Sequence, residues 1–574
     1  MTDPAAMPAV GTTKGPGESA GDFTFVTPDR DRAVKVGEFV YYQSEIDGVE
    51  ERIYGRVADR TPLKLYPDSF MADPSTSPRE VARILGFESA DSELYEIGVS
   101  VMGHFSESMG FVNPRIAPPP GLSVFLAEAK TLAKILSHKQ PGEIGAVHVG
   151  SLLTRRPGEV PISMDANEFT STHLAIIAGT GAGKSYLAGV IVEELLRPNN
   201  AAAVLIIDPH GEYETLEQIP NIGEFQQSDD GIDYRPEVKI VRAGELKVRR
   251  NLMRDDDILY LLGDLSTPQQ VIAQEALWRL RRTRGKWVLA DLLKAVDEVE
   301  ITGQRAAQIA GDGQEDYRSS KQALTMKLRN TLGRSGVFDD YDHTSLRDLL
   351  RPGRCAVLQV GEMDRRSQQI VVATIIRRAF EGRQGTKQGT ISEDNELHLP
   401  FPIFVLIEEA HHFAPAGTEV ATTNLFKEVL AEGRKFDFGM GLITQRPGKL
   451  DQDVLSQCMT QCIMRIVNPI DQSAVASAVE SVGRDLLVEL PALSKGQAIV
   501  SGAAVNATVL CRVRERLTPH GGASSNSAEI WTSYFRPKSV KQRRADKALF
   551  PTAGRDSDRD LARELFPDDQ ADGR

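Results

Sequence analysis

One glycine-rich stretch constrains the fold of this chain more than any other feature. It is Ala178-Gly-Thr-Gly-Ala-Gly-Lys-Ser185, which follows the apolar run His173-Leu-Ala-Ile-Ile-Ala178 and precedes the helix-like Tyr186-Leu-Ala-Gly-Val-Ile-Val-Glu-Glu-Leu-Leu196. A strand that leads into a glycine-rich turn and then a helix directs several backbone N–H groups, and the positive end of the helix dipole, at one point. Glycines are needed there because side chains would block the approach of a polyphosphate. The stretch therefore predicts a phosphate-binding loop in an α/β fold, although Ala178 occupies the first glycine position of the pattern.

The residues of this loop have separate expected roles. In loops of this type the lysine reaches the β- and γ-phosphates and the serine hydroxyl binds Mg²⁺, and we assign these roles to Lys184 and Ser185. An ordinary glycine-rich turn between a strand and a helix is the alternative interpretation. The expected nucleotide-binding residues are Gly179, Thr180, Gly181, Ala182, Gly183, Lys184, Ser185 and Tyr186.

A second apolar run, Ile403-Phe-Val-Leu-Ile-Glu-Glu-Ala-His-His412, ends in two carboxylates. At the carboxyl end of a strand they would lie beside the phosphate loop, where ligands collect in open α/β sheets. We expect Glu408 to hold the Mg²⁺ shell and Glu409 to polarise the attacking water, although aspartate is the commoner residue at the first of these positions. A charged strand end in contact with solvent is the alternative. The adjacent His411 and His412 lack the i, i+4 spacing of zinc ligands on a helix, so no zinc site is predicted.

Two further strand ends are predicted at the same edge of the sheet. In Ala203-Val-Leu-Ile-Ile-Asp-Pro-His-Gly-Glu-Tyr213, the residues Asp208 and His210 either contribute to the nucleotide site or simply form the turn. In Gly439-Met-Gly-Leu-Ile-Thr-Gln-Arg-Pro447, the amide of Gln445 can sense the γ-phosphate by hydrogen bonding.

Composition narrows the class of protein. No window approaches the roughly 18 consecutive apolar residues of a membrane span, and the first residues lack the pattern of a secretory signal, so we expect a cytoplasmic protein without a membrane segment. The four scattered cysteines do not form a disulfide framework. A formal net charge of −13 argues against a surface that attracts nucleic acid everywhere, but it permits a local basic channel.

Periodicity and turn signals divide the chain into six expected segments. β-rich runs recur after an N-terminal stretch rich in Pro and Gly, and helical patterns replace strands in the middle of the α/β region. The segments are a disordered arm (1–30), a small β-barrel (31–150), the first part of the α/β core (151–254), a helical insert (255–350), the second part of the core (351–517) and a C-terminal arm (518–574).

The motifs together resemble one family. Thr-Gly-Ala-Gly-Lys-Ser, Asp-Pro-His-Gly-Glu-Tyr, Glu-Glu-Ala-His, Glu-Gly-Arg-Lys and Thr-Gln-Arg-Pro occur in this order between about residues 170 and 515. This order is similar to that of the HerA branch of the HerA and FtsK superfamily of DNA-translocating ATPases. The resemblance implies a RecA-like core that uses ATP and Mg²⁺ in a hexameric ring with double-stranded DNA in its channel. It implies that Lys184 and Ser185 bind phosphate and Mg²⁺, that Glu409 is the catalytic glutamate and Gln445 the sensor, and that Arg434 is an arginine finger for the neighbouring subunit.

The resemblance also implies partners and leaves alternatives open. Such ATPases act with a nuclease, often NurA, in DNA end processing, or with a sirtuin-like or nuclease effector in defence against phage. The alternatives are a conjugation or secretion motor of the VirB4 and TraD type, and a ring scaffold whose nucleotide state gates a bound effector. A ring of seven subunits in place of six also stays open.

Two basic segments are candidates for contact with DNA phosphates. One is Arg383-Gln-Gly-Thr-Lys-Gln-Gly-Thr390, expected to be a flexible loop whose Arg383 and Lys387 reach DNA. The other is Arg279-Leu-Arg-Arg-Thr-Arg-Gly-Lys286, between Trp278 and Trp287 in the helical insert, for which a solvated helix face is the alternative.

Overall fold

The computed structural model describes residues 8–16, 21–29, 31–46, 48–63, 94–229, 232–283, 285–300, 314–479, 482–520 and 527–535. Contacts divide the chain into a unit of residues 1–521 and a unit of residues 522–574. In the second unit the described residues form the helix α17 (Ser527–Phe535). No helix among the described residues is long and apolar enough to cross a membrane.

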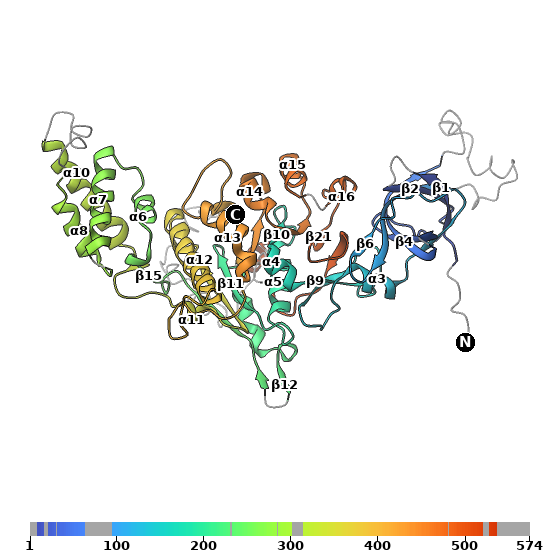
Figure 1. Ribbon diagram of the computed structural model, residues 1–574, viewed down its shortest axis with the longest axis horizontal. Coiled ribbons are helices and arrows are strands. Elements are labelled where there is room, and N and C mark those ends of the chain that lie inside the picture. The colour runs from blue at the N-terminus through green and yellow to red at the C-terminus, as the bar shows by residue number, and fades with distance from the viewer. Residues whose placement is uncertain are drawn as a thin grey trace, which may run out of the picture. The chain divides into compact units, whose positions relative to one another are not determined.

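The N-terminal strands close into a small barrel (Figure 1). Closure follows from the pairing of β2 with both β1 and β5, so the sheet has no free edge at that point. Alternate residues of β2, Phe23 and Phe25, are buried in its core with Val40, Ile97 and Val99. The barrel strands are β1 (Gly11–Pro16), β2 (Asp22–Thr27), β3 (Phe39–Ile46), β4 (Val49–Pro62), β5 (Tyr95–Ser106) and β7 (Ser123–Leu126), and β6 (Gly110–Val112) extends β5 as a hairpin.

Two expectations about this region are wrong. The predicted disordered arm contains β1 and β2, because the period-two pattern of Asp22–Thr27 supplies two of the barrel's core aromatics; residues 1–7, 17–20 and 30 lie outside the described residues. The sequence of residues 124–138 also predicts a helix, but this segment begins as the strand β7, and the helix α3 is confined to Ala129–Leu136.

The central sheet has the order β14-β17-β11-β18-β19-β10-β20-β21-β22-β8-β9. The seven strands from β14 to β20 are parallel to their neighbours, and the remaining pairings are antiparallel. The strands predicted from the apolar runs before residues 179, 209, 408 and 445 are present as β10, β11, β18 and β19. The bounds of the central strands are β8 (Ala146–Leu152), β9 (Pro161–Asp165), β10 (Leu174–Ile177), β11 (Ala203–Asp208), β14 (Glu237–Val241), β17 (Arg354–Gln359), β18 (Ile403–Ile407), β19 (Phe438–Thr444), β20 (Thr460–Met464), β21 (Gln497–Gly502) and β22 (Val509–Val513).

Helices cover both faces of this sheet, which explains why its strands are apolar throughout. Alternate residues of β10 enter different cores: Leu174 and Ile176 pack in one cluster, Ala175 and Ile177 in the other. The first cluster includes residues of α5 (Lys184–Leu195), and the second includes residues of α12 (Arg365–Lys387) and α13 (Thr423–Glu432). The arrangement confirms the predicted RecA-like α/β core.

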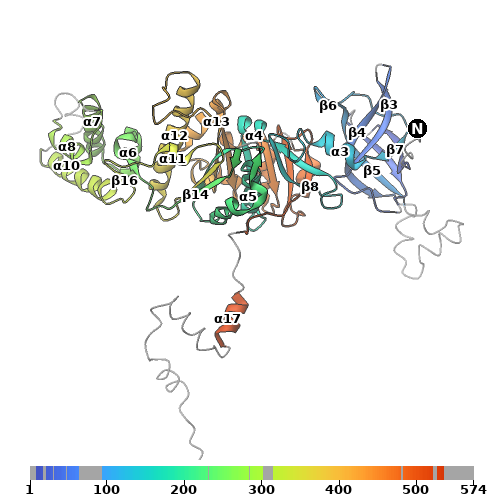
Figure 2. The ribbon, with the colours of Figure 1, turned by 90° about the horizontal axis from the view of Figure 1, so that it is seen from below.

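The expected helical insert is present (Figure 2). It consists mainly of α6 (Asp255–Leu262), α7 (Thr267–Thr283), α8 (Leu289–Glu298) and α10 (Gln314–Leu328), and residues 301–313 lie outside the described residues. A short parallel pair, β15 (Val248–Arg249) with β16 (Phe338–Asp339), lies at the two ends of the insert. The other short elements of the core are α4 (Ala166–Thr172), the strand pair β12 (Gln227–Asp229) and β13 (Ile232–Tyr234), α11 (Leu346–Leu349), α14 (Gln452–Ser456), α15 (Pro469–Ala478) and α16 (Arg484–Glu489).

Candidate nucleotide site

The predicted phosphate loop connects β10 to α5, in the geometry that the sequence indicated. Gly181 and Gly183 have φ angles of 76° and 109°, a region that residues with a Cβ rarely adopt. The loop is fastened to the next strand because the N–H of Gly179 donates to the carbonyl of Arg465 at 2.8 Å. A Cβ added at Gly179 would lie 2.9 Å from that oxygen, so glycine is required at this position.

Lys184 lies between the two glutamates at the end of β18. Its Nζ is 2.6 Å from Glu408 Oε1 and 3.3 Å from Glu409 Oε1, and both carboxylates are buried. Burial raises the pKa of Glu408 to about 7 although the charge of Lys184 lowers it. Burial would lower the pKa of Lys184, but the charges of Glu408, Glu409 and Glu212 and the hydrogen bond to Glu408 together outweigh burial, and the net pKa is raised. The structure thus brings together Lys184, which the sequence assigned to phosphate, Glu408, which it assigned to Mg²⁺, and Glu409, which it assigned to the attacking water.

Ser185, the first residue after Lys184, has the contacts of a magnesium ligand. Its Oγ lies 3.0 Å from Glu408 Oε1 and hydrogen-bonds Glu212. The other oxygen of Glu408, Oε2, is buried and has no hydrogen-bond partner in the described part of the chain. A hydroxyl and an unsatisfied carboxylate oxygen are ligands that suit Mg²⁺, which usually completes its shell with water and phosphate oxygens. The residues present therefore fit the ion. Within the described ranges, His, Cys, Asp and Glu form no metal-binding group of three, so the site does not resemble a protein-only metal centre.

Glu409 is held in a strained conformation. Its φ of 52° lies in the left-handed region, where a residue other than glycine costs of order 1–3 kcal/mol and is found mainly at functional sites. His411 Nδ1 hydrogen-bonds Thr444 Oγ1 at 3.2 Å and lies 3.2 Å from Glu409 Oε2, so the imidazole lies between Glu409 and the end of β19. Glu409 Oε2 itself has no hydrogen-bond partner in the described part of the chain. Nε2 of His210 is 3.8 Å from Glu409 Oε1. Burial lowers the pKa of His411, which favours the neutral ring.

Gln445 follows β19 and contacts the phosphate loop directly. Thr180 Oγ1 donates to Gln445 Oε1 at 3.0 Å. The neighbouring β19 and β10 are parallel, with Ile177 opposite Thr444, and this register places the amide at the level of the loop. The amide thus joins a strand end to the loop that precedes Lys184.

The two residues of the β11 turn differ in role. The carboxylate of Asp208 is buried and accepts the N–H groups of His210 at 3.0 Å and Gly211 at 2.8 Å, as a turn former does. Burial raises the pKa of Asp208 although these hydrogen bonds lower it. His210 instead lies near Glu409. Sequence reasoning missed Glu212 in this turn, whose only signal was a carboxylate four residues after the strand.

Tyr186 lies on α5 directly after Ser185. Its Oη accepts the N–H of Arg516 at 2.7 Å, and its ring contacts that of His520 with centroids 5.8 Å apart. Its predicted contact with the nucleotide stays a prediction.

The predicted arginine finger and the predicted DNA loop lie apart from this cluster. Arg434 is exposed in the 3₁₀ turn Gly433–Phe436 and makes no ion pair or hydrogen bond among the described residues. Arg383 and Lys387 are not in a flexible loop but in the last turns of α12, which corrects that expectation. Arg383 is buried. Its guanidinium forms an ion pair with Oδ2 of Asp437 at 2.7 Å, and Nζ of Lys387 lies 2.9 Å from the same oxygen. Arg383 therefore has no free face for DNA.

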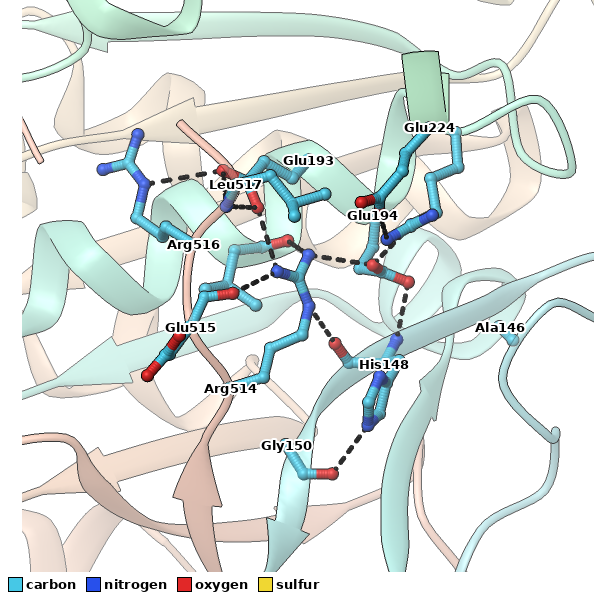
Figure 3. Close-up of polar contacts among 12 residues, drawn as sticks. Ala146, His148, Gly150, Glu193, Glu194, Glu224, Arg514, Glu515, Arg516 and Leu517 are labelled. Atoms are coloured by element: carbon cyan, nitrogen blue, oxygen red, sulfur yellow. Dashed lines mark hydrogen bonds and ion pairs between the residues drawn. The ribbon is translucent and has the colours of Figure 1, made fainter. Parts of the chain in front are cut away.

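A network of buried charges fixes the far half of α5 (Figure 3). Arg514, just after β22, lies 3.0 Å from Glu193 Oε2 and 2.8 Å from Glu194 Oε1. Glu193 is fully buried and also accepts the N–H of Leu517 and Thr518. The helix that carries Lys184 and Ser185 at its start is thereby bound at its end to the segment 514–518.

The two-sided parallel sheet, the glycine-rich loop and the polar side chains at adjacent strand ends define a P-loop ATPase. Residues 147–379 match the family described as the central domain of helicase HerA. Together with the relatives below, this match supports a HerA-type ATPase, in agreement with the resemblance seen in the motifs.

Relatives of known name cover most of the chain. A probable helicase of Methanocaldococcus jannaschii is 28% identical over 524 residues, which are 90% of this chain and 92% of the relative. The DNA double-strand break repair helicase HerA of Pyrococcus furiosus is 28% identical over 403 residues, 64% of this chain and 69% of the relative. Among solved structures, VirB4 of Thermoanaerobacter pseudethanolicus aligns at 12% identity with a TM-score of 0.46, covering 65% of this chain and 97% of its own.

Proposed function

We propose that this protein is an ATP-driven motor that moves along double-stranded DNA as a homo-hexamer. ATP and Mg²⁺ bind at the loop 179–186, with Lys184 against the phosphates and Ser185 and Glu408 holding the ion, which offsets phosphate charge when bound. Glu409 orients and activates the attacking water, and Gln445 relays the state of the γ-phosphate to the end of β19.

One observation carries this proposal: the side chains of Lys184 and Ser185, at the start of α5, meet those of Glu408 and Glu409, at the end of β18. Gln445, at the end of β19, contacts Thr180 of the same phosphate loop. A phosphate cradle beside a buried catalytic carboxylate is the arrangement that nucleotide hydrolysis needs. Through its contact with the loop, the amide of Gln445 can transmit the loss of the γ-phosphate to the rest of the sheet. Relatives named as helicases support DNA as the track.

The state of Arg434 supports a ring. Its guanidinium is exposed and has no ion-pair partner in the described part of this subunit. An arginine supplied by a neighbour would stabilise charge that develops on the transferred phosphoryl group. We therefore assign Arg434 to the site of an adjacent subunit, so that hydrolysis requires assembly.

The proposed motor needs a partner enzyme that acts on the DNA. A motor of this type supplies movement, and we propose that a nuclease similar to NurA, or a defence effector of the sirtuin-like or nuclease class, acts on the DNA that the motor delivers. A relative is named a double-strand break repair helicase, which favours the nuclease.

The first test is ATP hydrolysis with and without a linear duplex. We expect duplex DNA to stimulate turnover several-fold, and Glu409→Gln to abolish turnover while nucleotide still binds. If Glu409→Gln still moves along DNA, or if duplex leaves the rate of the unmodified protein unchanged, the motor function is wrong.

A mixing experiment tests the shared site. Arg434→Ala keeps Glu409, and Glu409→Gln keeps Arg434, so a mixed ring contains some interfaces at which both groups are intact. We expect each variant alone to be inactive and the mixture to recover part of the activity. Lys435→Ala, an exposed neighbour, is the matched control and should stay active. If mixed rings form but show no ATPase activity, Arg434 either acts in the nucleotide site of its own subunit or takes no part in hydrolysis.

A further inference from the structure

The helical insert carries a hollow of about 580 Å³ between α7 and α8. Trp278 forms part of its wall and has 52% of its surface exposed, whereas Trp287 of the same insert is buried. The guanidinium of Arg282 lies 4.6 Å from the centre of the Trp278 ring. Packing of the insert thus uses one tryptophan and leaves the other, with its cation, at the surface.

One cation of this hollow has no acidic partner among the described residues. Arg282, which lines the hollow, is exposed and forms no ion pair with any residue that the structure describes. The other charged residues of the wall are engaged already: Arg279 pairs with Glu275, Glu298 lies 3.5 Å from Lys294, and Asp291 accepts the N–H of Val288 at the start of α8. In a chain with a net charge of −13, an unpaired arginine against an exposed indole forms a distinct local surface.

The combination of groups selects one class of ligand. An indole face stacks on an unpaired base, and neighbouring cations contact the phosphates, which is how proteins hold single strands without reading sequence. A duplex hides its base faces and would use the cation alone. We propose that the groove between α7 and α8 binds single-stranded DNA, with Trp278 stacked on a base and Arg282 against a phosphate.

This site contains none of the residues of the nucleotide site and, resting on the proposed function, it gives the motor a second contact with DNA at an unpaired end. The direct measurement is tryptophan emission of the full-length protein with Trp531→Phe, because Trp531 is also exposed and Trp287 is buried. We expect a twelve-nucleotide oligothymidine to quench the remaining exposed indole in a saturable way without ATP, and a blunt duplex to leave it unchanged.

Variants then separate stacking from charge. Trp278→Leu should weaken the anisotropy-measured affinity for labelled oligothymidine roughly tenfold, and Trp278→Phe should recover part of it. Arg282→Gln should reduce the slope of log affinity against log salt by about 0.7. Trp531→Leu and Arg235→Gln, exposed residues elsewhere, are the matched controls and should change neither quantity.

Three results would overturn the inference. They are an affinity unchanged by Trp278→Leu, equal quenching by blunt duplex, and markedly tighter binding of oligouridine than of oligothymidine at this site. Because each of these assays omits ATP, they can fail while duplex-stimulated hydrolysis persists, and the reverse also holds.

Discussion

Lys184 and Glu408 form a buried ion pair, with Nζ 2.6 Å from Oε1, at the point where the phosphate loop meets the end of β18. Lys184 therefore has two roles. It presents a positive charge to phosphate, and it balances the negative charges of two buried carboxylates. Glu408 and Glu409 repel each other, and the ammonium between them makes their joint burial possible.

Removal of Lys184 should therefore reduce stability as well as activity. We expect Lys184→Met to lower the unfolding free energy by about 3 kcal/mol, because it leaves two buried carboxylates without a cation. Adding Glu408→Gln should restore part of this loss, since only one charge then remains; the two effects should be strongly non-additive. Denaturant unfolding of the two single variants and the double variant measures the coupling. Additive effects would show that Glu408 and Lys184 do not stabilise each other.

Local motifs at strand ends made most of this site predictable. The loop 179–186, Glu408, Glu409 and Gln445 each follow an apolar run, and parallel strands bring such ends to one edge. The contacts of Glu212 and His411 were not predictable in the same way. His411 lies between Glu409 and Thr444 because β18 and β19 are neighbours in the sheet. The order of strands in the sheet cannot be predicted from any single segment of the sequence.

The error at residues 383–390 has a specific cause. Gly385 and Gly389 gave that stretch the composition of a loop, yet Gly385, like the preceding Gly382, lies inside α12 because other parts of the chain pack against the helix there. A Cβ would meet the carbonyl of Leu397 at 2.6 Å from Gly382, and the side chain of Ile391 at 2.5 Å from Gly385. Glycine in this helix serves close packing, which only the tertiary structure reveals.

His411 should act as a positioning residue for Glu409. Its Nδ1 lies 3.2 Å from both Glu409 Oε2 and Thr444 Oγ1, and its loss would leave the carboxylate free to turn from the orientation that activates water. We expect His411→Ala to lower kcat for ATP about 10- to 100-fold with little change in KM, because the effect is on a group used in the transition state. Steady-state hydrolysis with duplex DNA gives both constants.

His412→Ala is the matched control for this prediction. The ring of His412 lies beside that of His411, with centroids 4.3 Å apart, but it makes no contact with Glu409 among the described residues. The variant His412→Ala should keep most of the ATPase activity. A rise in KM with kcat preserved in His411→Ala would assign His411 to nucleotide binding in place of the positioning of Glu409.

The buried charges behind α5 predict a stability effect away from the reacting groups. Glu193→Gln removes a fully buried charge that binds Arg514 at 3.0 Å and accepts two backbone N–H groups, so we expect a loss of about 3 kcal/mol in unfolding free energy. Glu224→Gln, a largely exposed carboxylate 3.5 Å from Arg197, is the control and should change stability by less than about 0.5 kcal/mol. Equal melting curves for the two variants would show that the network in Figure 3 does not hold the helix.

His173 predicts how stability changes with pH. The ring is buried directly before β10, with Nε2 2.8 Å from the carbonyl of Leu430 and Nδ1 accepting the N–H of Met440 at 3.1 Å. Burial lowers its pKa from 6.5 to about 4, so between these values the unfolded chain binds a proton that the folded protein does not. The contribution of His173 to the free energy of unfolding is fully present above pH 6.5. It falls as the pH drops toward 4, by about 3 kcal/mol in total.

Replacement of His173 should remove that part of the pH dependence. His173→Gln loses stability at pH 7 because the buried hydrogen bonds are changed, but its unfolding midpoint should fall less steeply between pH 6.5 and 4.5 than that of the unmodified protein. His138→Gln serves as the control, since His138 is exposed and should leave the slope unchanged. Protonation of His173 would place a second ring N–H against the N–H of Met440, which no rotation of a buried imidazole avoids. Parallel midpoint curves for His173→Gln and the unmodified protein would mean that the acid sensitivity of this unit comes from other groups.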